Sequence, residues 1–362
     1  MRLQQSAYMH WAKLYSSARF NLASSGVASF PLRDLGVTIE QLEINGDNPY
    51  GYAPLRIAIA NKYGVDAECI VTAAGTSMAN HLAMAALIKP GDEVILEHPS
   101  YELLTATASY LGADIKRFTR HEENNYALEP AEIRRVLSPE TRLIVLTNLH
   151  NPTSVLTPNS VLREVGDLAW SVGAHVLVDE VYLDAAYDNT PQSACHLGPE
   201  FVVTSSLTKA YGLSGLRCGW IIAQPALAQA MWRLNDLFAA TAVHPAELLS
   251  VVAFQKLPAI RERARKIVDA DRALLSNFLA QQTKVSAVQT EFGTTSFLRL
   301  KNGDADRFLE RLRTDYETSA VPGRFFGMPD HFRVGMGVNT EMFGEGLRQV
   351  ALALARSVDF SS

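Results

Sequence analysis

The chain has 362 residues, 48% of them hydrophobic and 20% charged, which gives room for about two domains and excludes a disordered, collagen-like or disulfide-scaffold protein. Its 33 Lys and Arg residues against 38 Asp and Glu residues give a net charge of -5, so no global basic field exists for nucleic acid or an anionic membrane. Its 3 cysteines, Cys69, Cys195 and Cys218, lie far apart and favour a reducing compartment over a disulfide framework.

The first 20 residues carry charges and aromatic rings but lack the apolar stretch of a secretory signal. The most apolar runs elsewhere, such as 251–254 and 351–355, are far too short to cross a bilayer. We therefore expect a cytoplasmic protein that binds neither nucleic acid nor a membrane.

Between residues 69 and 223, short apolar or β-branched runs alternate with helical segments, which indicates an α/β fold. The expected strands are 69–73, 93–96, 114–118, 142–147, 175–178, 201–204 and 218–223, and the expected helices include 76–88, 101–111, 130–136 and 159–171. Continuous apolarity in 176–178 is typical of strands buried on both faces. We expect a large domain with a mostly parallel seven-stranded sheet covered by helices.

The last third of the chain changes to the pattern of a smaller α+β domain. Its expected elements are a long helix at 259–281, strands at 295–300 and 331–334, helices at 304–314 and 340–356, and a Pro-Gly turn at 321–323. The first 40 residues have no place in the alternating pattern, so we expect them to join this part. The predicted division is an N-terminal segment 1–40, a large domain 41–258 and a C-terminal small domain 259–362.

The sharpest local signal follows the expected strand at 201–204. Ser206, Thr208, Lys209 and Arg217 place two hydroxyls, an amine and a guanidinium in a glycine-containing turn that could hold a phosphate. In open α/β sheets, ligands bind beyond the carboxyl ends of the strands, where this turn lies. Taken alone, such a cluster is more often a solvated loop.

Other strand ends carry complementary groups: an acid, a phenol, an amide and an aromatic ring, at Asp179, Tyr182, Asn151 and Tyr101. Gly75, Thr76 and Ser77 lie between a strand and a helix, where backbone N–H groups can hold an anion. Each group also has an ordinary interpretation as a helix cap, an Asn-Pro turn or a packed tyrosine. Their joint occurrence at the strand ends of one sheet is the stronger signal.

This set, in this order, resembles fold-type I pyridoxal-phosphate enzymes and, among them, the class I/II aminotransferase family. The resemblance is strongest between residues 73 and 220 and returns at 332–335. It implies a homodimer that binds pyridoxal 5'-phosphate in the domain 41–258. It further implies transfer of an amino group from an amino acid to a 2-oxo acid by a ping-pong mechanism.

The resemblance also implies roles for the cofactor-binding residues. Lys209 would form the internal aldimine, and Asp179 would pair with the protonated pyridine nitrogen. Tyr182 and Asn151 would hydrogen-bond the phenolic oxygen, while Tyr101 would stack on the ring. The phosphate would be held by Gly75, Thr76, Ser77, Ser206, Thr208 and Arg217.

Substrate and partner contacts follow from the same resemblance. Arg333 would bind the substrate α-carboxylate, helped by backbone near Gly26, although a surface ion pair is the alternative for this arginine. Tyr50 would reach the cofactor phosphate of the neighbouring subunit, with Tyr52 as the alternative because the segment is shorter than usual.

Four positions depart from the family pattern, add to it or have no assigned role. Leu149 stands where a further proline is common, Ser154 replaces the usual glycine, and His150 lies between them without an assigned role. Arg324 is either a solvated surface residue or a contact to an acidic substrate side chain. The sequence shows no close pairing of metal ligands, dinucleotide-binding fingerprint or P-loop, so we expect no metal.

Two rival functions stay open. A lyase, cyclase or synthase could use the same residues with the same cofactor, because pocket geometry selects the bond that breaks. A non-catalytic regulator with this fold is the other rival. The presence of Lys209, Asp179 and Arg217 argues against it.

Overall fold

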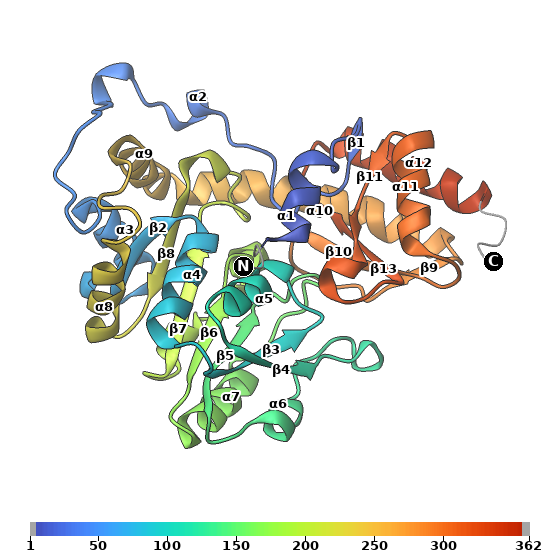
Figure 1. The fold of residues 1–362 in the computed structure, drawn as a ribbon. Helices are drawn as coiled ribbons and strands as arrows, with labels where there is room; N and C mark the ends of the chain where they lie inside the picture. Colours follow the sequence, from blue (N-terminus) through green and yellow to red (C-terminus); the bar gives the residue numbers. More distant parts are fainter. Residues whose placement is uncertain (1–4, 357–362) are drawn as a thin grey trace.

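The computed structural model describes residues 5–356, which form two parts lying side by side (Figure 1). The helices are α1 Ala7–Leu14, α2 Leu32–Leu35, α3 Ala53–Tyr63, α4 Thr76–Leu87, α5 Glu102–Tyr110, α6 Pro130–Val136, α7 Asn159–Ser171, α8 Pro225–Asn235, α9 His244–Gln255, α10 Leu257–Gln281, α11 Ala305–Asp315 and α12 Thr340–Arg356. The strands are β1 Phe20–Asn21, β2 Ile70–Ala74, β3 Glu93–His98, β4 Asp114–Thr119, β5 Thr141–Thr147, β6 His175–Asp179, β7 Phe201–Ser206, β8 Cys218–Ile222, β9 Val285–Ala287, β10 Thr295–Leu300, β11 Thr318–Ser319, β12 Val321–Pro322 and β13 His331–Gly335.

Seven strands form the large sheet, in the order β2-β8-β7-β6-β5-β3-β4. Strands β4, β3, β5, β6 and β7 run parallel to one another. Strand β8 runs antiparallel to both of its neighbours, β7 and β2. The predicted α/β fold with a mostly parallel seven-stranded sheet is confirmed, and each expected strand is found within a few residues of its predicted bounds.

Helices cover both faces of this sheet. Val176 and Val178 pack into the core on one face, against α3, α6, α7, α9 and the start of α10. Leu177, between them, packs into the core on the other face, against α4, α5 and α8. Because successive side chains of a strand point to opposite faces, a strand covered on both sides must be apolar throughout. This explains the continuous apolar run in the sequence.

The second part combines the C-terminal third with the start of the chain. Its four-stranded antiparallel sheet has the order β12-β13-β10-β9 and packs with α10, α11 and α12. Strand β1 pairs in parallel with β11, so that Phe20 lies opposite Thr318. Leu22 is fully buried in the same core as Phe332. Residues 20–22 of the N-terminal segment therefore join the smaller α+β part, as predicted, whereas Leu35 of the same segment is buried in the core of the large part. The domain boundaries at 40/41 and 258/259 stay predictions.

The carboxyl ends of the central parallel strands lie along one edge of the large sheet. Strands β3, β5, β6 and β7 end there at His98, Thr147, Asp179 and Ser206. Figure 1 shows α1 lying between this edge and the second part of the molecule. Polar side chains that follow these strands therefore lie at the edge of the large sheet that is next to α1 and the second part of the molecule.

Two further findings concern the described chain as a whole. No helix between residues 5 and 356 has the length and apolarity needed to span a bilayer. In the same part of the chain, no group of three or more His, Cys, Asp or Glu side chains is arranged to hold a metal ion.

Candidate active site

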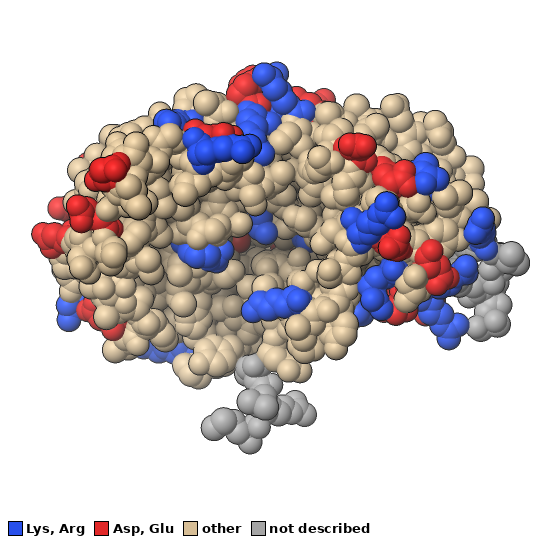
Figure 2. Space-filling view, turned by 90° about the horizontal axis from the view of Figure 1, so that it is seen from above, with Lys and Arg blue, Asp and Glu red and all other residues tan. Residues whose placement is uncertain are grey.

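A cavity of about 430 Å³ lies at the carboxyl edge of the large sheet, next to the N-terminal segment. Figure 2 shows a hollow near the middle of the face seen from above. The cavity is lined by these predicted site residues: Thr76, Ser77, Tyr101, Asn151, Asp179, Tyr182, Ser206, Thr208, Lys209 and Arg217. The structure thus brings together side chains from six separate places in the sequence.

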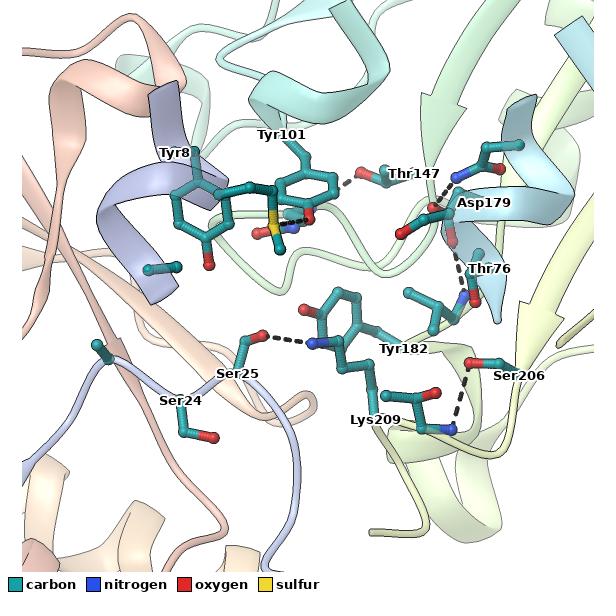
Figure 3. A pocket seen from close by; sticks show the side chains of 18 of the residues that line it. Tyr8, Ser24, Ser25, Thr76, Tyr101, Thr147, Asp179, Tyr182, Ser206 and Lys209 are labelled. Carbon is teal, nitrogen blue, oxygen red and sulfur yellow. Dashed lines mark hydrogen bonds between the residues drawn. The ribbon is translucent and has the colours of Figure 1, made fainter. Parts of the chain in front are cut away.

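Lys209 extends into this cavity from the turn that follows β7 (Figure 3). Its Nζ donates a hydrogen bond to Ser25 Oγ at 3.0 Å. Burial of the amine lowers the pKa of Lys209, because the charged form loses its contact with water. A lysine with a lowered pKa more readily presents a neutral amine, which is the form that attacks a carbonyl carbon.

Asp179, the last residue of β6, offers a buried carboxylate to the same cavity. Its Oδ2 accepts a hydrogen bond from Asn80 Nδ2 at 2.8 Å, and its Oδ1 accepts one from the backbone N–H of Val181 at 3.0 Å. Burial raises the pKa of Asp179 to about 6, although these two hydrogen bonds oppose the shift. A cationic group brought against this carboxylate would keep it ionised.

Asn80 is a cavity residue that the sequence analysis missed. Its Oδ1 accepts a hydrogen bond from Thr204 Oγ1 at 2.6 Å, which leaves the amide group to donate to Asp179. A sequence signal existed, because Asn80 lies one helical turn after Thr76 and so shares its side of α4.

The turn between β2 and α4 forms a cradle at the far end of the cavity. Gly75 has a φ of +81°, and a Cβ atom there would lie only 2.3 Å from Arg217 Nη2. Arg217 is fixed by a hydrogen bond of 3.1 Å from Nη2 to the carbonyl oxygen of Ala74. Glycine at position 75 therefore lets a guanidinium approach the start of a helix, where both the helix dipole and the charge favour an anion.

Hydroxyl groups complete this cradle. The Oγ1 atom of Thr76, the first residue of α4, is buried and has no hydrogen-bond partner among the described residues. Ser206 Oγ accepts a hydrogen bond of 3.2 Å from the backbone N–H of Thr208. A buried hydroxyl without a partner is costly, so its presence here indicates a group that an anion would satisfy.

Two tyrosines form the walls between these ends. Tyr101 precedes α5, and its hydroxyl lies 3.7 Å from Met9 Sδ as a hydrogen-bond donor. Burial raises the pKa of Tyr101 and, likewise, that of Tyr182. Both phenols therefore stay protonated near neutral pH and can donate hydrogen bonds.

Arg333 lies in β13 and is fully buried. Its Nη1 donates to Asn151 Oδ1 at 2.8 Å and its Nη2 donates to Tyr8 Oη at 3.0 Å. The Nε atom has no hydrogen-bond partner among the described residues. The guanidinium thus lies just behind the cavity wall, and two residues that do line the cavity, Asn151 and Tyr8, separate it from the open space.

Gly26 and Tyr50 do not line this cavity. A Cβ on Gly26 would lie 3.4 Å from Lys209 Cα, so the backbone of residue 26 packs against the lysine. Tyr50 lies in a separate hollow, where its hydroxyl accepts a hydrogen bond from Arg233 and its ring contacts Trp232. Tyr52 packs edge-on against His244. Whether Tyr50 or Tyr52 serves a neighbouring subunit stays a prediction.

A buried ion pair supports the wall behind Asn151. Glu97 and Arg120 are both inaccessible to solvent, with 2.9 Å between Oε2 and Nη2. Glu97 Oε1 also accepts hydrogen bonds from the backbone N–H and the Oγ1 of Thr147, at 2.8 and 2.6 Å. Thr147 Oγ1 in turn accepts from the backbone N–H of Asn151 at 2.9 Å. The sequence analysis missed this pair.

His150 belongs to the same buried layer. Its Nε2 lies 2.9 Å from the carbonyl oxygen of Pro99, and its Nδ1 lies 2.7 Å from Thr153 Oγ1. Burial lowers the pKa of His150 well below its usual range, so the ring is neutral. A carbonyl can only accept, so Nε2 carries the proton and Nδ1 accepts from the threonine. The arrangement gives His150 a structural role.

The other unassigned positions lie outside the cavity. Ser154 has a φ of 65° and donates to the carbonyl oxygen of Thr295 at 2.8 Å, so the loop retains the left-handed conformation that glycine usually provides. Leu149 is fully buried in the core of the large part. Arg324 forms a partly exposed ion pair with Asp306, in agreement with the solvated interpretation of this arginine.

The chain resembles known proteins over most of its length. A family model for aminotransferases of class I and II matches residues 40–350. Capreomycidine synthase of Streptomyces vinaceus is 29% identical over 350 residues, or 93% of this chain and 90% of that protein. Arginine–pyruvate transaminase of Pseudomonas aeruginosa is 26% identical over 325 residues, or 84% of this chain and 81% of that protein. A solved PLP-dependent aminotransferase from Streptococcus suis matches with a TM-score of 0.93 and 26% identity, over 99% of this chain and 100% of that chain.

The cavity fits pyridoxal phosphate on three observations. A Cβ at Gly75 would fill the cradle beside Arg217. The buried hydroxyl of Thr76 lacks a partner within the described chain, as expected where a phosphate would bind. Lys209 and Asp179 present an amine and a carboxylate to the same space. The chain belongs to the class I and II aminotransferase family, and its cofactor is pyridoxal 5'-phosphate.

Proposed function

We propose that this protein is an aminotransferase that moves an amino group from an amino acid to a 2-oxo acid by a ping-pong mechanism. The observation that carries the proposal is that Lys209 and Asp179 face one cavity, with an anion cradle at its far end. When bound, the cofactor supplies an aldehyde for the amino group and a ring that withdraws electrons from the substrate Cα.

Several residues would hold the cofactor in a fixed orientation. The phosphate would lie at the start of α4, held by Arg217 and by the hydroxyls of Thr76, Ser206 and Thr208, with Gly75 and Ser77 contributing backbone. Tyr101 would stack on the ring, while Tyr182 and Asn151 would donate hydrogen bonds to its phenolic oxygen. Asp179 would keep the pyridine nitrogen protonated, because a buried carboxylate favours a neighbouring cation.

Lys209 would act twice in the reaction. Its neutral amine would first bond covalently to the cofactor and would be released when the substrate amine takes its place. The released Nζ would then remove the proton at the substrate Cα and return a proton during formation of the product. The hydrogen bond to Ser25 Oγ supports this role, because it holds the amine inside the cavity at 3.0 Å.

Arg333 would bind the substrate α-carboxylate through its positive charge, which is buried just behind the cavity wall formed by Asn151 and Tyr8. The backbone near Gly26 would assist. We further propose a cytoplasmic homodimer in which Tyr50 reaches the cofactor of the neighbouring subunit. Light scattering after gel filtration tests the dimer, and a monomer with full activity would contradict it.

The experiment that tests this function combines spectroscopy with a panel of amino donors. The purified protein with cofactor should be yellow, and one or two amino acids alone should convert the cofactor stably to its amine form. Addition of a 2-oxo acid should then restore the first spectrum. Borohydride reduction followed by digestion should place the cofactor on the Lys209 peptide. A label on another peptide, or no spectral change with any donor, would contradict the proposal.

A second function is favoured by one observation. The relative with 29% identity over 93% of this chain is named a synthase rather than a transaminase. A cyclase, lyase or other synthase could therefore use the same cofactor site. In that case an amino acid alone would give continuous product formation, without a 2-oxo acid and without accumulation of the cofactor's amine form.

A further inference from the structure

Tyr8 is a cavity residue for which the proposed function has no role. It lies in the first turn of α1, whose N-cap is Ser6, and its side chain is only 8% exposed. Its ring is held edge-on by Tyr101 and Phe325, with centroid distances of 5.5 and 5.6 Å. Because the ring is packed on both sides, the position of its hydroxyl is well determined.

The hydroxyl of Tyr8 has an unused proton. Its oxygen accepts a hydrogen bond from Arg333 Nη2 at 3.0 Å. Among residues 5–356, no acceptor receives the proton of this hydroxyl. Figure 3 shows the oxygen pointing into the open space of the cavity, on the side where Ser25 and Lys209 lie. A phenol that accepts from a guanidinium is polarised, which makes it a better donor to an anion.

Arg333 cannot be reached from the cavity without meeting Tyr8 or Asn151. Each of its terminal nitrogens donates one N–H to one of these two residues, which holds both of them against the guanidinium. The guanidinium does not line the cavity, whereas Tyr8 does. A carboxylate that enters toward the positive charge therefore meets the hydroxyl of Tyr8 next to it.

We propose that Tyr8 is a substrate-binding residue whose hydroxyl, held by Arg333, donates a hydrogen bond to the substrate α-carboxylate. The inference rests on the proposed function, in which that carboxylate lies beside Arg333. Charge-assisted hydrogen bonds from a buried donor change affinity by about 10- to 100-fold. The carboxylate would thus be recognised by two elements from opposite ends of the chain: α1, which carries Tyr8, and β13, which carries Arg333.

The test uses the purified protein with cofactor and two small probes, propionate and propionamide, which differ in the carboxylate. Binding is followed by the visible absorption of the cofactor. We expect the wild type to bind propionate and to show little affinity for propionamide. The Tyr8→Phe variant, which keeps the packed ring, should bind propionate about 10- to 100-fold more weakly. Its cofactor spectrum should be unchanged.

Tyr15→Phe is the matched control, because Tyr15 is the C-cap of the same helix and its ring is exposed. It should bind propionate as the wild type does. Equal binding of propionate by Tyr8→Phe and the wild type would overturn the proposal, and so would equal binding of both probes by the wild type. If the protein binds propionate more tightly than propionamide but does not catalyse transamination, the result would contradict only the proposed function.

Discussion

Lys209, Asp179 and Thr76, on the cofactor side of the cavity, each lie within three residues of the end of a strand in the large sheet. Tyr8 and Arg333, on the other side, are separated by 325 residues in the sequence and meet through a hydrogen bond and through the guanidinium, which lies 5.8 Å from the centroid of the Tyr8 ring. The topology of one sheet brings the residues of the cofactor side together. The residues of the other side come together only because α1 and the smaller part pack against that sheet.

This difference predicts how the two sides respond to mutation. Changes on the cofactor side should reduce turnover equally for every amino donor, because they alter chemistry common to all substrates. Changes on the other side should raise KM and should act on substrate binding while the cofactor stays bound. The variants below test this division, from the largest expected effect to the smallest.

Removal of the amine by Lys209→Ala should have the largest effect. We expect turnover to fall by about 10⁴-fold for every donor, since the proposed function assigns to this amine both the covalent bond to the cofactor and the proton transfer at Cα. Steady-state kinetics with the donor panel measures this. Lys13→Ala, at an exposed lysine of α1, is the control and should keep full activity. A donor-dependent loss in Lys209→Ala would contradict the division between the two sides.

The Glu97–Arg120 pair joins the two sides, because it supports Thr147 and, through it, Asn151. Glu97→Gln leaves a buried guanidinium without its countercharge and should lower the free energy of unfolding by about 3–5 kcal/mol. Denaturant unfolding measures the change. Glu310→Gln, which breaks the exposed pair with Arg313, should cost less than about 1 kcal/mol.

A double variant sharpens this test. Arg120→Met combined with Glu97→Gln removes the unpaired charge and should recover most of the lost stability. No recovery would mean that the hydrogen bonds to Thr147, rather than the ion pair, stabilise this layer.

Loss of the buried carboxylate by Asp179→Asn should reduce turnover by about 10²-fold for all donors, because in the proposed function this carboxylate keeps the ring nitrogen of the cofactor protonated. Stopped-flow measurement of the first half-reaction isolates this step from product release. A change confined to KM would place Asp179 on the substrate side and so contradict its assignment.

The same carboxylate predicts a pH dependence in the cofactor-free protein. Burial raises the pKa of Asp179 from 3.8 to about 6, so the folded state binds the extra proton between these values. Stability should therefore fall as the pH rises through this window, by up to about 3 kcal/mol. Asp179→Asn cannot titrate and should lack this loss. Parallel unfolding curves of the two proteins across the window would contradict the prediction.

The cofactor side of the cavity could be predicted from the sequence to a greater extent than the other side. The large sheet and the residues at its strand ends could be predicted, because alternating apolar runs mark the strands and a parallel sheet gathers their ends. Asn80 was missed although its helical spacing from Thr76 was visible. Glu97 gave no signal, since its partners Arg120 and Thr147 are brought to it only by tertiary packing.

Tyr8 could not be predicted for a further reason. Its helix is short, and its position depends on contacts with α5 and with Phe325, far along the chain. No local pattern distinguishes such a tyrosine from Tyr15, which lies on the surface a few residues later. Side chains that meet through long-range packing therefore need the structure, even when their chemistry is ordinary.

Substitution of Arg324 should have the smallest effect on activity and stability, and it tests whether the substrate-binding side of the cavity extends to this residue. Its guanidinium pairs with Asp306 and lies 4.6 Å from the ring centroid of Phe325, outside the cavity lining. Arg324→Ala should change KM for neutral and acidic donors by less than about twofold and stability by less than about 1 kcal/mol, as for other exposed pairs. Arg313→Ala, at a similarly exposed arginine of α11, is the control. A selective rise in KM for acidic donors would show that substrate binding draws Arg324 away from Asp306, and the substrate side would then extend to residues 323–326.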